Sequence, residues 1–359
     1  MFEGIVYRRL KMKKQGTIKK AVWVLTAVVM AVWAADLTIV ARADTKPKIV
    51  WKVGTLTPKG VGWAHQFETI MMPVIQSGTD SELKVKVYWG GLMGDDEDII
   101  SKMRVGQLQA AGLTGQGATI ACPEFAVVEL PFLFKSYAEV DHIREKMWPE
   151  FDRLMQARGF KLLAWLDQDF DQIYSVKWSF TDLADFQKAR FMTWYGTLEE
   201  HLLKSLNASP IPVNIPELAP SLRQGVADSL IAPALWMIAT QLYPVVNYMV
   251  PLNIRYSPAV VVCTLDAWNS LSAASRAGLA AARPEMEKQF VAASRKDNQK
   301  AMDAMVKYGI VRVDMTDAQV ETIRKGAVTV WDDQAGTLYS RELLDRILVH
   351  LDQYRSQTP

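Results

Sequence analysis

Hydrophobic and polar positions follow two different periods along the first third of the chain. Residues 48–56 (KIVWKVGTL) and 83–91 (LKVKVYWGG) alternate with period two, which is typical of strands. Residues 62–79 carry apolar side chains at helical spacing, and residues 95–108 open with four acids, which the N-terminus of a helix favours. Residues 108–117 (LQAAGLTGQG) indicate a short strand that enters a glycine-rich turn. This β-α-β-α-β order predicts a parallel sheet with helices on its faces.

The rest of the chain mixes the same elements and then becomes helical. Strand-like patterns occupy residues 160–168, 172–178, 189–194, 210–215, 228–234, 248–254 and 258–265. Helical patterns occupy residues 197–208, 216–227, 266–307, 316–336 and 340–354. Pro284 predicts a kink in the longest of these helices. Thr316, with Gln319 three residues later, is typical of a helix N-cap.

This order predicts an α/β fold with two lobes. We expect lobe I over residues 44–169 and lobe II over residues 170–256, with part of residues 257–310 crossing back to lobe I. Residues 257–359 would supply a crossing strand and long C-terminal helices that pack on both lobes. Ligands of open α/β sheets bind outside the carboxyl ends of the strands, so we expect a cleft where the strand ends of the two lobes converge.

The first 43 residues have the pattern of a secretory signal peptide. A basic segment precedes an apolar run of 15 residues, 21–35, and the triplet ARA at 41–43 matches a cleavage site before Asp44. A retained membrane anchor is the alternative, although the run is shorter than the roughly 20 residues that span a bilayer. Met12 is an alternative start. Export by a cleaved leader predicts a periplasmic protein.

Charge and composition exclude several classes of partner and chemistry. Without residues 1–43 the chain has 33 basic and 37 acidic residues, which gives no electrostatic reason to bind nucleic acid or anionic lipid. Cys122 and Cys263 sit among apolar residues, and two buried free thiols are favoured over a disulfide, which remains open. The four histidines have no ligand spacing, so we expect no metal site and no cofactor. The sequence contains no GxSxG or HExxH motif, so we expect no hydrolase.

Four segments in order resemble the DctP-type solute-binding proteins of TRAP transporters. They are VYWGGLMGDDEDIISKMRVGQLQAAGLTGQG (87–117), ELPFLFKSYAEVDHI (129–143), DLADFQKARFMTW (182–194) and ELAPSLRQGVADSL (217–230). The likeness extends over about residues 48–353. It implies a type II periplasmic-binding-protein fold, with two α/β lobes, a hinge cleft and long C-terminal helices. It also implies a receptor, not an enzyme, that captures a solute by lobe closure and delivers it to TRAP membrane permease subunits.

The resemblance also implies a role for Arg190. The matching arginine of the family forms a bidentate salt bridge with the substrate carboxylate, and a planar guanidinium suits that geometry. The alternative is that Arg190 pairs within the protein, for example with Asp171 or Asp228. The sequence leaves both open.

This sequence departs from the family pattern at several cleft positions. Where many carboxylate-binding members have a second arginine after an aromatic residue, this chain has Asp171 after Phe170. An acid there would repel a second carboxylate, accept from a ligand hydroxyl or ammonium, or neutralise Arg190. Ser229 replaces a glycine, and the apolar residues 231–233 replace polar ones. The predicted cleft has therefore lost polar groups and gained apolar ones.

The predicted ligand-binding residues combine rings with a few polar groups. The rings are Trp63, Trp89, Phe170, Trp194, Tyr195 and Trp236, and the polar candidates are Thr57, Gln116, Gln168 and Gln172, beside Arg190, Asp171 and Asp228. Each ring alone more often belongs to a core than to a pocket. The favoured function is a TRAP-type receptor for an organic acid with one carboxylate and an apolar or aromatic body. The alternative is an exported carrier of a hydrophobic or lipid-like ligand, and the protein could be a monomer or a homodimer.

Overall fold

The computed structural model describes residues 49–60, 62–181, 183–194, 196–213 and 217–357. Contacts divide the chain into residues 1–47 and 48–359, and the description concerns the second unit alone. The predicted signal peptide and the candidate Tyr195 lie outside the described residues. Among the described residues, no helix combines the length and the apolar character that crossing a membrane requires.

The described residues form one mixed sheet of nine strands. Their order is β2-β1-β3-β8-β4-β7-β5-β6, with β9 paired to β8. The strands are β1 (Ile49–Thr55), β2 (Leu83–Tyr88), β3 (Ala110–Leu113), β4 (Phe160–Ser175), β5 (Arg190–Thr193), β6 (Ser209–Pro212), β7 (Ser229–Ala232), β8 (Tyr248–Thr264) and β9 (Val311–Arg312). Parallel β1, β2 and β3 form lobe I, and parallel β5, β6 and β7 form lobe II. The predicted parallel sheet is confirmed, and the exact lobe boundaries stay a prediction.

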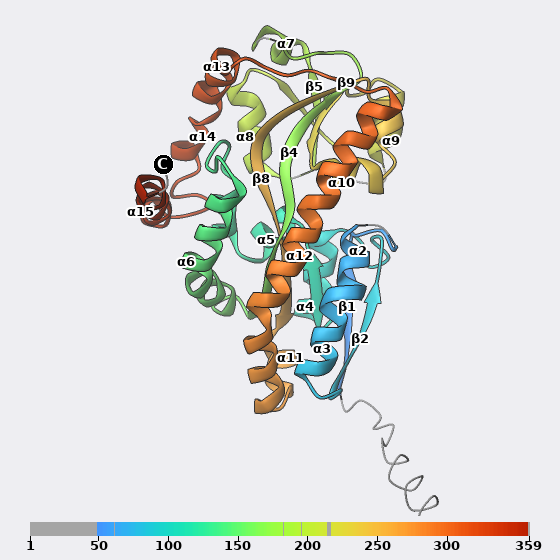
Figure 1. Cartoon of the computed structure of the whole chain (residues 1–359), viewed down its shortest axis with the longest axis vertical. Helices are drawn as coiled ribbons and strands as arrows, with labels where there is room; N and C mark the ends of the chain where they lie inside the picture. Colours follow the sequence, from blue (N-terminus) through green and yellow to red (C-terminus); the bar gives the residue numbers. More distant parts are fainter. Residues whose placement is uncertain (1–48, 61, 182, 195, 214–216, 358–359) are drawn as a thin grey trace, which may run out of the picture. The chain divides into compact units, whose positions relative to one another are not determined.

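Two long antiparallel strands join the lobes. β4 pairs with β8 from Phe160–Thr264 at one end to Ser175–Tyr248 at the other, so both strands pass through the middle of the molecule (Figure 1). The sequence predicted two shorter strands in each of these regions. The structure keeps them continuous because register shifts, such as the one between Asp167 and Asp169, bend the ribbon without ending it.

Short helices cover the sheet of each lobe. In lobe I they are α2 (Trp63–Gln66), η1 (Phe67–Met71), α3 (Met72–Gly78), α4 (Asp96–Arg104), α5 (Gly115–Ala121), η2 (Pro123–Glu129) and α6 (Tyr137–Gln156). In lobe II they are α7 (Leu183–Lys188), α8 (Thr197–Ser205), α9 (Leu218–Arg223), α10 (Ala234–Ala239) and η4 (Tyr243–Val245). Polar side chains begin several of them: Asp95 accepts from Asp98 N at 3.1 Å, and Thr114 accepts from Gly117 N at 3.3 Å.

The C-terminal helices tie the lobes together. They are α11 (Leu265–Ser270), α12 (Ala273–Tyr308), α13 (Asp317–Ala327), α14 (Val330–Asp333) and α15 (Arg341–Gln357). α12 packs on α3 of lobe I, on β4, and on α10 of lobe II (Figure 1). It continues through Pro284 as one helix. The predicted N-cap at Thr316 is confirmed as a capping box with Gln319. α15 packs on α6 of the same chain.

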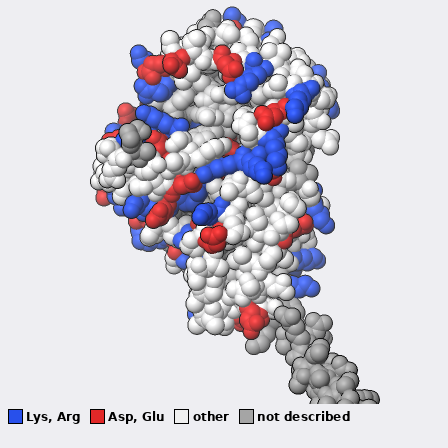
Figure 2. Space-filling model, viewed as in Figure 1, with Lys and Arg blue, Asp and Glu red and all other residues white. Residues whose placement is uncertain are grey.

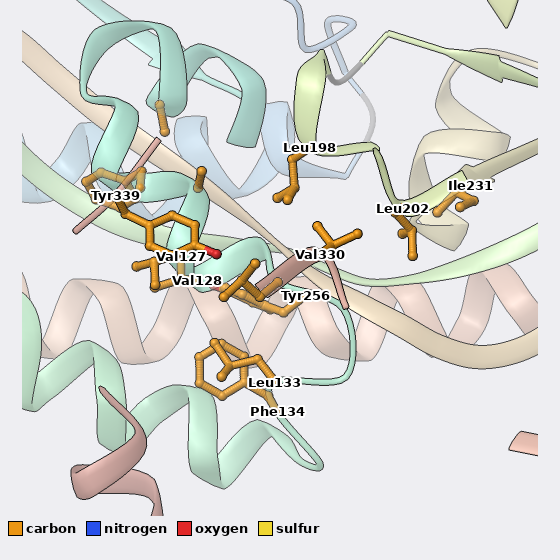
Figure 3. Packing of buried hydrophobic residues seen from close by; sticks show 14 of the residues in the cluster. Val127, Val128, Leu133, Phe134, Leu198, Leu202, Ile231, Tyr256, Val330 and Tyr339 are labelled. Carbon is orange, nitrogen blue, oxygen red and sulfur yellow. The ribbon is translucent and has the colours of Figure 1, made fainter. Parts of the chain in front are cut away.

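The largest hydrophobic cluster contains residues of both lobes. Val127 and Val128 of η2, Leu198 and Leu202 of α8 and Val330 of α14 all belong to it (Figure 3). These helices lie far apart in the sequence. Basic and acidic side chains are interspersed on the face in Figure 2.

Candidate functional site

A cavity of about 730 Å³ lies where the strand ends of the two lobes meet. Lobe I contributes residues after β2 and β3, and lobe II contributes residues at the ends of β5 and β6. The lining includes Gly90, Gly91, Asp96, Thr114 and Gln116 on one side and Thr193, Trp194, Gly196, Pro212, Val213 and Trp236 on the other. This is the position at which open α/β sheets bind ligands.

A second cavity, about 70 Å³ in volume, adjoins the first. Leu56, Thr114 and Trp236 line both cavities. The smaller one reaches into lobe I and is mostly apolar. Its walls include Thr55, Thr57, Trp63, Phe67, Trp89, Gln168 and Phe290.

The structure brings most of the predicted ligand-binding residues to these two cavities. Trp194 and Gln116 line the larger cavity, and Trp236 lines both. The predicted residues on the smaller cavity are Thr57, Trp63, Trp89 and Gln168. Thr57 and Trp89 follow strands β1 and β2, Trp63 lies in α2, and Gln168 lies within β4. These residues line the cavities, as the sequence predicts, and their contact with a ligand stays a prediction.

Two tryptophans that line the smaller cavity have indole N–H groups without a hydrogen-bond partner among the described residues. Trp63 and Trp236 are 7% and 3% exposed, and the Nε1 of each is buried without a hydrogen-bond partner among the described residues. A buried N–H without an acceptor costs free energy comparable to a lost hydrogen bond. Two such groups on one cavity therefore favour a guest that carries oxygen acceptors.

Neighbouring contacts hold the other walls of this cavity in place. Phe67 and Trp89 pack edge to face with their ring centroids 5.6 Å apart. The Oε1 of Gln168 accepts from Gly115 N at 3.3 Å, and its backbone oxygen accepts from Asn298 Nδ2 at 3.0 Å. These bonds fix the Gln168 amide at the cavity before any ligand arrives.

The larger cavity is acidic. Its lining carries six carboxylates, from Asp95, Asp96, Glu97, Asp98, Glu200 and Glu217, and no Lys, Arg or His is among the described lining residues. Asp96 is the most buried of the six, at 4% exposure, and one of its oxygens accepts from the hydroxyl of Thr114. Burial raises the pKa of Asp96 from 3.8 to about 6, which leaves the carboxyl mostly ionised at neutral pH.

Arg190 lies at the wrong end of its strand to clamp a ligand in either cavity. It is the first residue of β5, and the cavity lies at the last residue, Thr193, about 10 Å further along an extended chain. Its side chain is 49% exposed, donates to Gly225 O at 2.7 Å and pairs with Asp228 at 3.6 Å. Arg190 thus pairs within the protein with Asp228 and lines neither cavity, and its role as a ligand clamp stays a prediction. Asp228 itself lines neither cavity.

Phe170, Asp171 and Gln172 likewise line neither cavity. Phe170 packs against the rings of Tyr137 and Tyr256. Asp171 is fully buried and accepts from Arg255 Nε at 2.7 Å, so its ion-pair partner is Arg255 and not Arg190. Gln172 bonds to Asn253. The register explains this, because Phe170 and Asp171 pair with Tyr256 and Arg255 of β8, and Gln172 pairs with Ala232 of β7.

A buried charge cluster behind the cavity escaped the sequence analysis. Arg255, whose side chain is 1% exposed, lies 2.7 Å from Asp171, 3.8 Å from Glu129 and 3.7 Å from Glu199. Glu129 belongs to lobe I and Glu199 to lobe II, so the cluster bridges the lobes. Burial raises the pKa of Glu129 to about 8. We name these four residues the Arg255 cluster.

The Arg255 cluster lies directly behind the cavity wall. A Cβ added to Gly115 would lie 2.4 Å from Glu129 Oε2, and Trp194 N donates to Glu199 Oε2 at 3.3 Å. Gly115 precedes Gln116, which lines the larger cavity together with Trp194. The only signal in the sequence was Asp171 itself, because a buried acid in a strand requires a cation nearby. The pairing of Asp171 with Arg255 follows from the β4–β8 register, which no local pattern encodes.

Comparison with known proteins places the chain among solute-binding proteins. The family model DctP, bacterial extracellular solute-binding protein, family 7, matches residues 63–337. An uncharacterized protein of Haemophilus influenzae is 27% identical over 198 residues, 55% of this chain and only 60% of that protein. The C4-dicarboxylate-binding periplasmic protein DctP of Rhodobacter capsulatus is 25% identical over 251 residues, 69% of this chain and 74% of that protein.

Solved structures show the same fold. The crystal structure of the sugar acid binding protein DctPAm from Advenella mimigardefordensis, in complex with galactonate, has a TM-score of 0.79 to this chain. It is 20% identical and covers 86% of this chain and 99% of that chain. At this identity the likeness establishes the two-lobed α/β architecture.

Proposed function

The chain belongs to the bacterial extracellular solute-binding proteins of family 7, and from that membership we propose that it captures a small organic acid between its lobes and delivers it to a TRAP-type membrane permease. The resemblance seen in the sequence is thereby confirmed. The family consists of binding receptors, so the protein is a receptor and not an enzyme. Its relatives are extracytoplasmic, and export to the periplasm by the leader over residues 1–43 is part of the proposal.

The position of the larger cavity carries this proposal. Its walls come from the carboxyl ends of strands in both lobes, with Gln116 on one side and Trp194 on the other. A solute that contacts both walls stabilises the closed arrangement, because its binding free energy depends on their approach. β4 and β8, which join the lobes, are the elements about which such closure would occur.

The acid group of the solute would bind at the smaller cavity. DctP of Rhodobacter capsulatus is named for C4-dicarboxylates, and the Advenella structure holds galactonate, a sugar acid. In this chain the buried Nε1 groups of Trp63 and Trp236 are donors for a carboxylate there, and Gln168 adds a fixed amide. An apolar body would pack on Phe67 and Trp89.

A carrier of a lipid-like ligand is less well supported. The apolar cavity has a volume of only about 70 Å³, and the adjoining larger cavity is lined by six carboxylates. Burying a long hydrocarbon chain against ionised groups would be unfavourable.

A thermal-shift and calorimetric screen of organic acids tests the proposal. We expect at least one acid to raise the unfolding temperature of the wild type and of Arg190→Ala equally, because Arg190 lies outside both cavities. Trp236→Phe keeps most of the ring and removes the N–H donor, so it should weaken binding about tenfold, the equivalent of one lost hydrogen bond. If no acid binds, or if Arg190→Ala alone abolishes binding, the proposed site is wrong.

A further inference from the structure

A third cavity, of about 110 Å³, lies in lobe I next to the smaller cavity. Val261 of β8 lines both of them. The described lining of the third cavity contains no Asp or Glu, so a hydrocarbon there would not lie against ionised carboxylates as it would in the larger cavity. We name this cavity the rear chamber. Its walls include Trp51, Met71, Ala164, Leu279 and Met286.

The sheet places the rear chamber one row of side chains further from the cleft than the smaller cavity. In β1, Trp51 lines the chamber and Val53 lines the smaller cavity. In β4, Ala164 and Leu166 divide in the same way. Residues two apart in a strand point to the same face and lie about 7 Å apart along it. Since both strands run from the chamber toward the cleft, the chamber continues the smaller cavity into lobe I.

The helices over this face of the sheet repeat the arrangement. Phe67 lines the smaller cavity, and Met71, four residues later, lines the chamber. In α12, Phe290 and Met286 divide in the same way. Both methionines are buried, at 3% and 6% exposure. A methionine side chain is unbranched and has three rotatable bonds, so these two can change shape and admit a guest that extends from one cavity into the other.

The backbone between the two cavities is unusual as well. Residues Phe67–Met71 form a π-helical turn, η1, between α2 and α3. Such turns are rare and occur frequently at functional sites. The turn begins at a residue of the smaller cavity and ends at a residue of the rear chamber. It is therefore an independent indication that the two cavities serve one site.

Cations placed over aromatic rings limit the rear chamber at its far end. The Arg283 guanidinium lies 3.7 Å from the ring centroid of Trp148, and Lys161 Nζ lies 5.5 Å from that of Trp268. All four residues line the chamber. Lys161 is at the start of β4 and Trp268 follows β8, so this pair lies at the strand ends opposite to the cleft. The chamber therefore suits an apolar body of medium length and is too short for a lipid chain.

We infer that the apolar body of the captured acid passes Met71 and Met286 and occupies the rear chamber, so that the preferred solute is a monocarboxylate with a medium-length apolar chain. The inference rests on the proposed function and specifies its substrate class. The carboxylate stays at the cleft end of the smaller cavity, and the chain extends past Phe67 into lobe I.

Calorimetry with a series of straight-chain acids tests the inference on the purified protein. The probes are butanoate, hexanoate, octanoate and dodecanoate, which differ only in chain length. Each methylene that enters the chamber should strengthen binding by about fourfold at most, so we expect octanoate to bind at least about tenfold more tightly than butanoate. Dodecanoate should bind no more tightly than octanoate, because the chamber ends at Lys161 and Arg283.

Two variants of α12 locate the effect. Ala277 and Ala280 are both exposed on this helix, and of the two only Ala280 lines the chamber. Ala280→Phe places a ring where the chain would lie, so it should reduce the ratio of the octanoate and butanoate affinities by about tenfold. Ala277→Phe is the matched control and should leave that ratio unchanged. A general effect of a ring on the stability of α12 would change the unfolding temperature of both variants without changing the ratio.

The outcomes separate the inference from the proposed function. If octanoate binds no more tightly than butanoate, or if the two variants have the same ratio, the rear chamber is not part of the site and the organic-acid receptor stands. The same holds if none of the four probes binds although another acid does. If no probe binds and the organic-acid screen is also negative, both are wrong.

Discussion

Replacing Arg255 with methionine should destabilise the protein severely, because three carboxylates converge on this one guanidinium. Asp171 lies 2.7 Å from Arg255 and is completely buried, so removing the cation leaves an uncompensated buried charge. Breaking a buried pair in this way costs about 3–5 kcal/mol. For a protein of this size we expect the unfolding temperature to fall by roughly 5–15 °C.

Urea and thermal unfolding followed by circular dichroism at pH 7 measures this loss. Arg255→Met with Asp171→Asn is the matched control, since it removes the stranded charge, and we expect it to be more stable than Arg255→Met alone. The single variant should also recover stability at pH 5, where the buried acids hold their protons more readily. A loss below about 1 kcal/mol at pH 7, or a double variant less stable than the single, would refute the role of the Arg255 cluster in joining the lobes.

Three further predictions concern buried groups. Folding raises the pKa of Glu129 from 4.5 to about 8, so the folded protein holds this proton more tightly than the unfolded chain. The free energy of unfolding should therefore fall as pH rises between these two values, by up to about 1.4 kcal/mol per pH unit. Glu129→Gln should flatten this part of the pH profile, measured by urea unfolding. Gly278→Ala should cost more than about 1 kcal/mol in the same assay, because the new Cβ would lie 2.1 Å from Gly78 O where α12 crosses α3; an unchanged midpoint would show that the helices separate freely. Cys122 and Cys263 are free and fully buried, so an aromatic disulfide reagent should react with both only at the rate of unfolding, and rapid labelling of the native protein would contradict this burial.

The strand ends of the site could be predicted because local signals mark them. Thr57 precedes a Pro-Lys-Gly turn, Trp89 precedes Gly-Gly, and Gln116 sits in a glycine-rich turn. Each signal ends a strand, and strand ends of a parallel sheet meet at one edge. Trp236 followed from the short strand before it. Local sequence patterns were therefore sufficient to predict many of the residues that line the cavities.

The sequence could not place Arg190 relative to the cavities, because its neighbourhood marks a strand without marking which end of that strand faces the cleft. The apolar residues that follow it are the strand, so Arg190 is at the amino end and the cavity lies at the other. Trp194, which follows the carboxyl end of the same strand, lines the larger cavity as predicted. Placement of a polar residue thus depended on chain direction more than on residue type.

The Arg255 cluster could not be predicted, because its members are brought together only by tertiary structure. Glu129 and Glu199 lie in helices of different lobes, and Arg255 reaches Asp171 through the register of β4 and β8. That register depends on three irregular steps along the pair. Each register shift changes which residues face each other across the two strands, and nothing in the local sequence pattern predicts these shifts.

Identification of the bound solute tests the account most directly. The protein is equilibrated with a metabolite extract, washed and denatured, and the released small molecules are identified by tandem mass spectrometry. Trp236→Phe, prepared in the same way, is measured beside it. We predict one stoichiometric species with a carboxyl group, depleted in the variant. A long-chain hydrocarbon compound, or an acid held equally by both proteins, would contradict the proposed site.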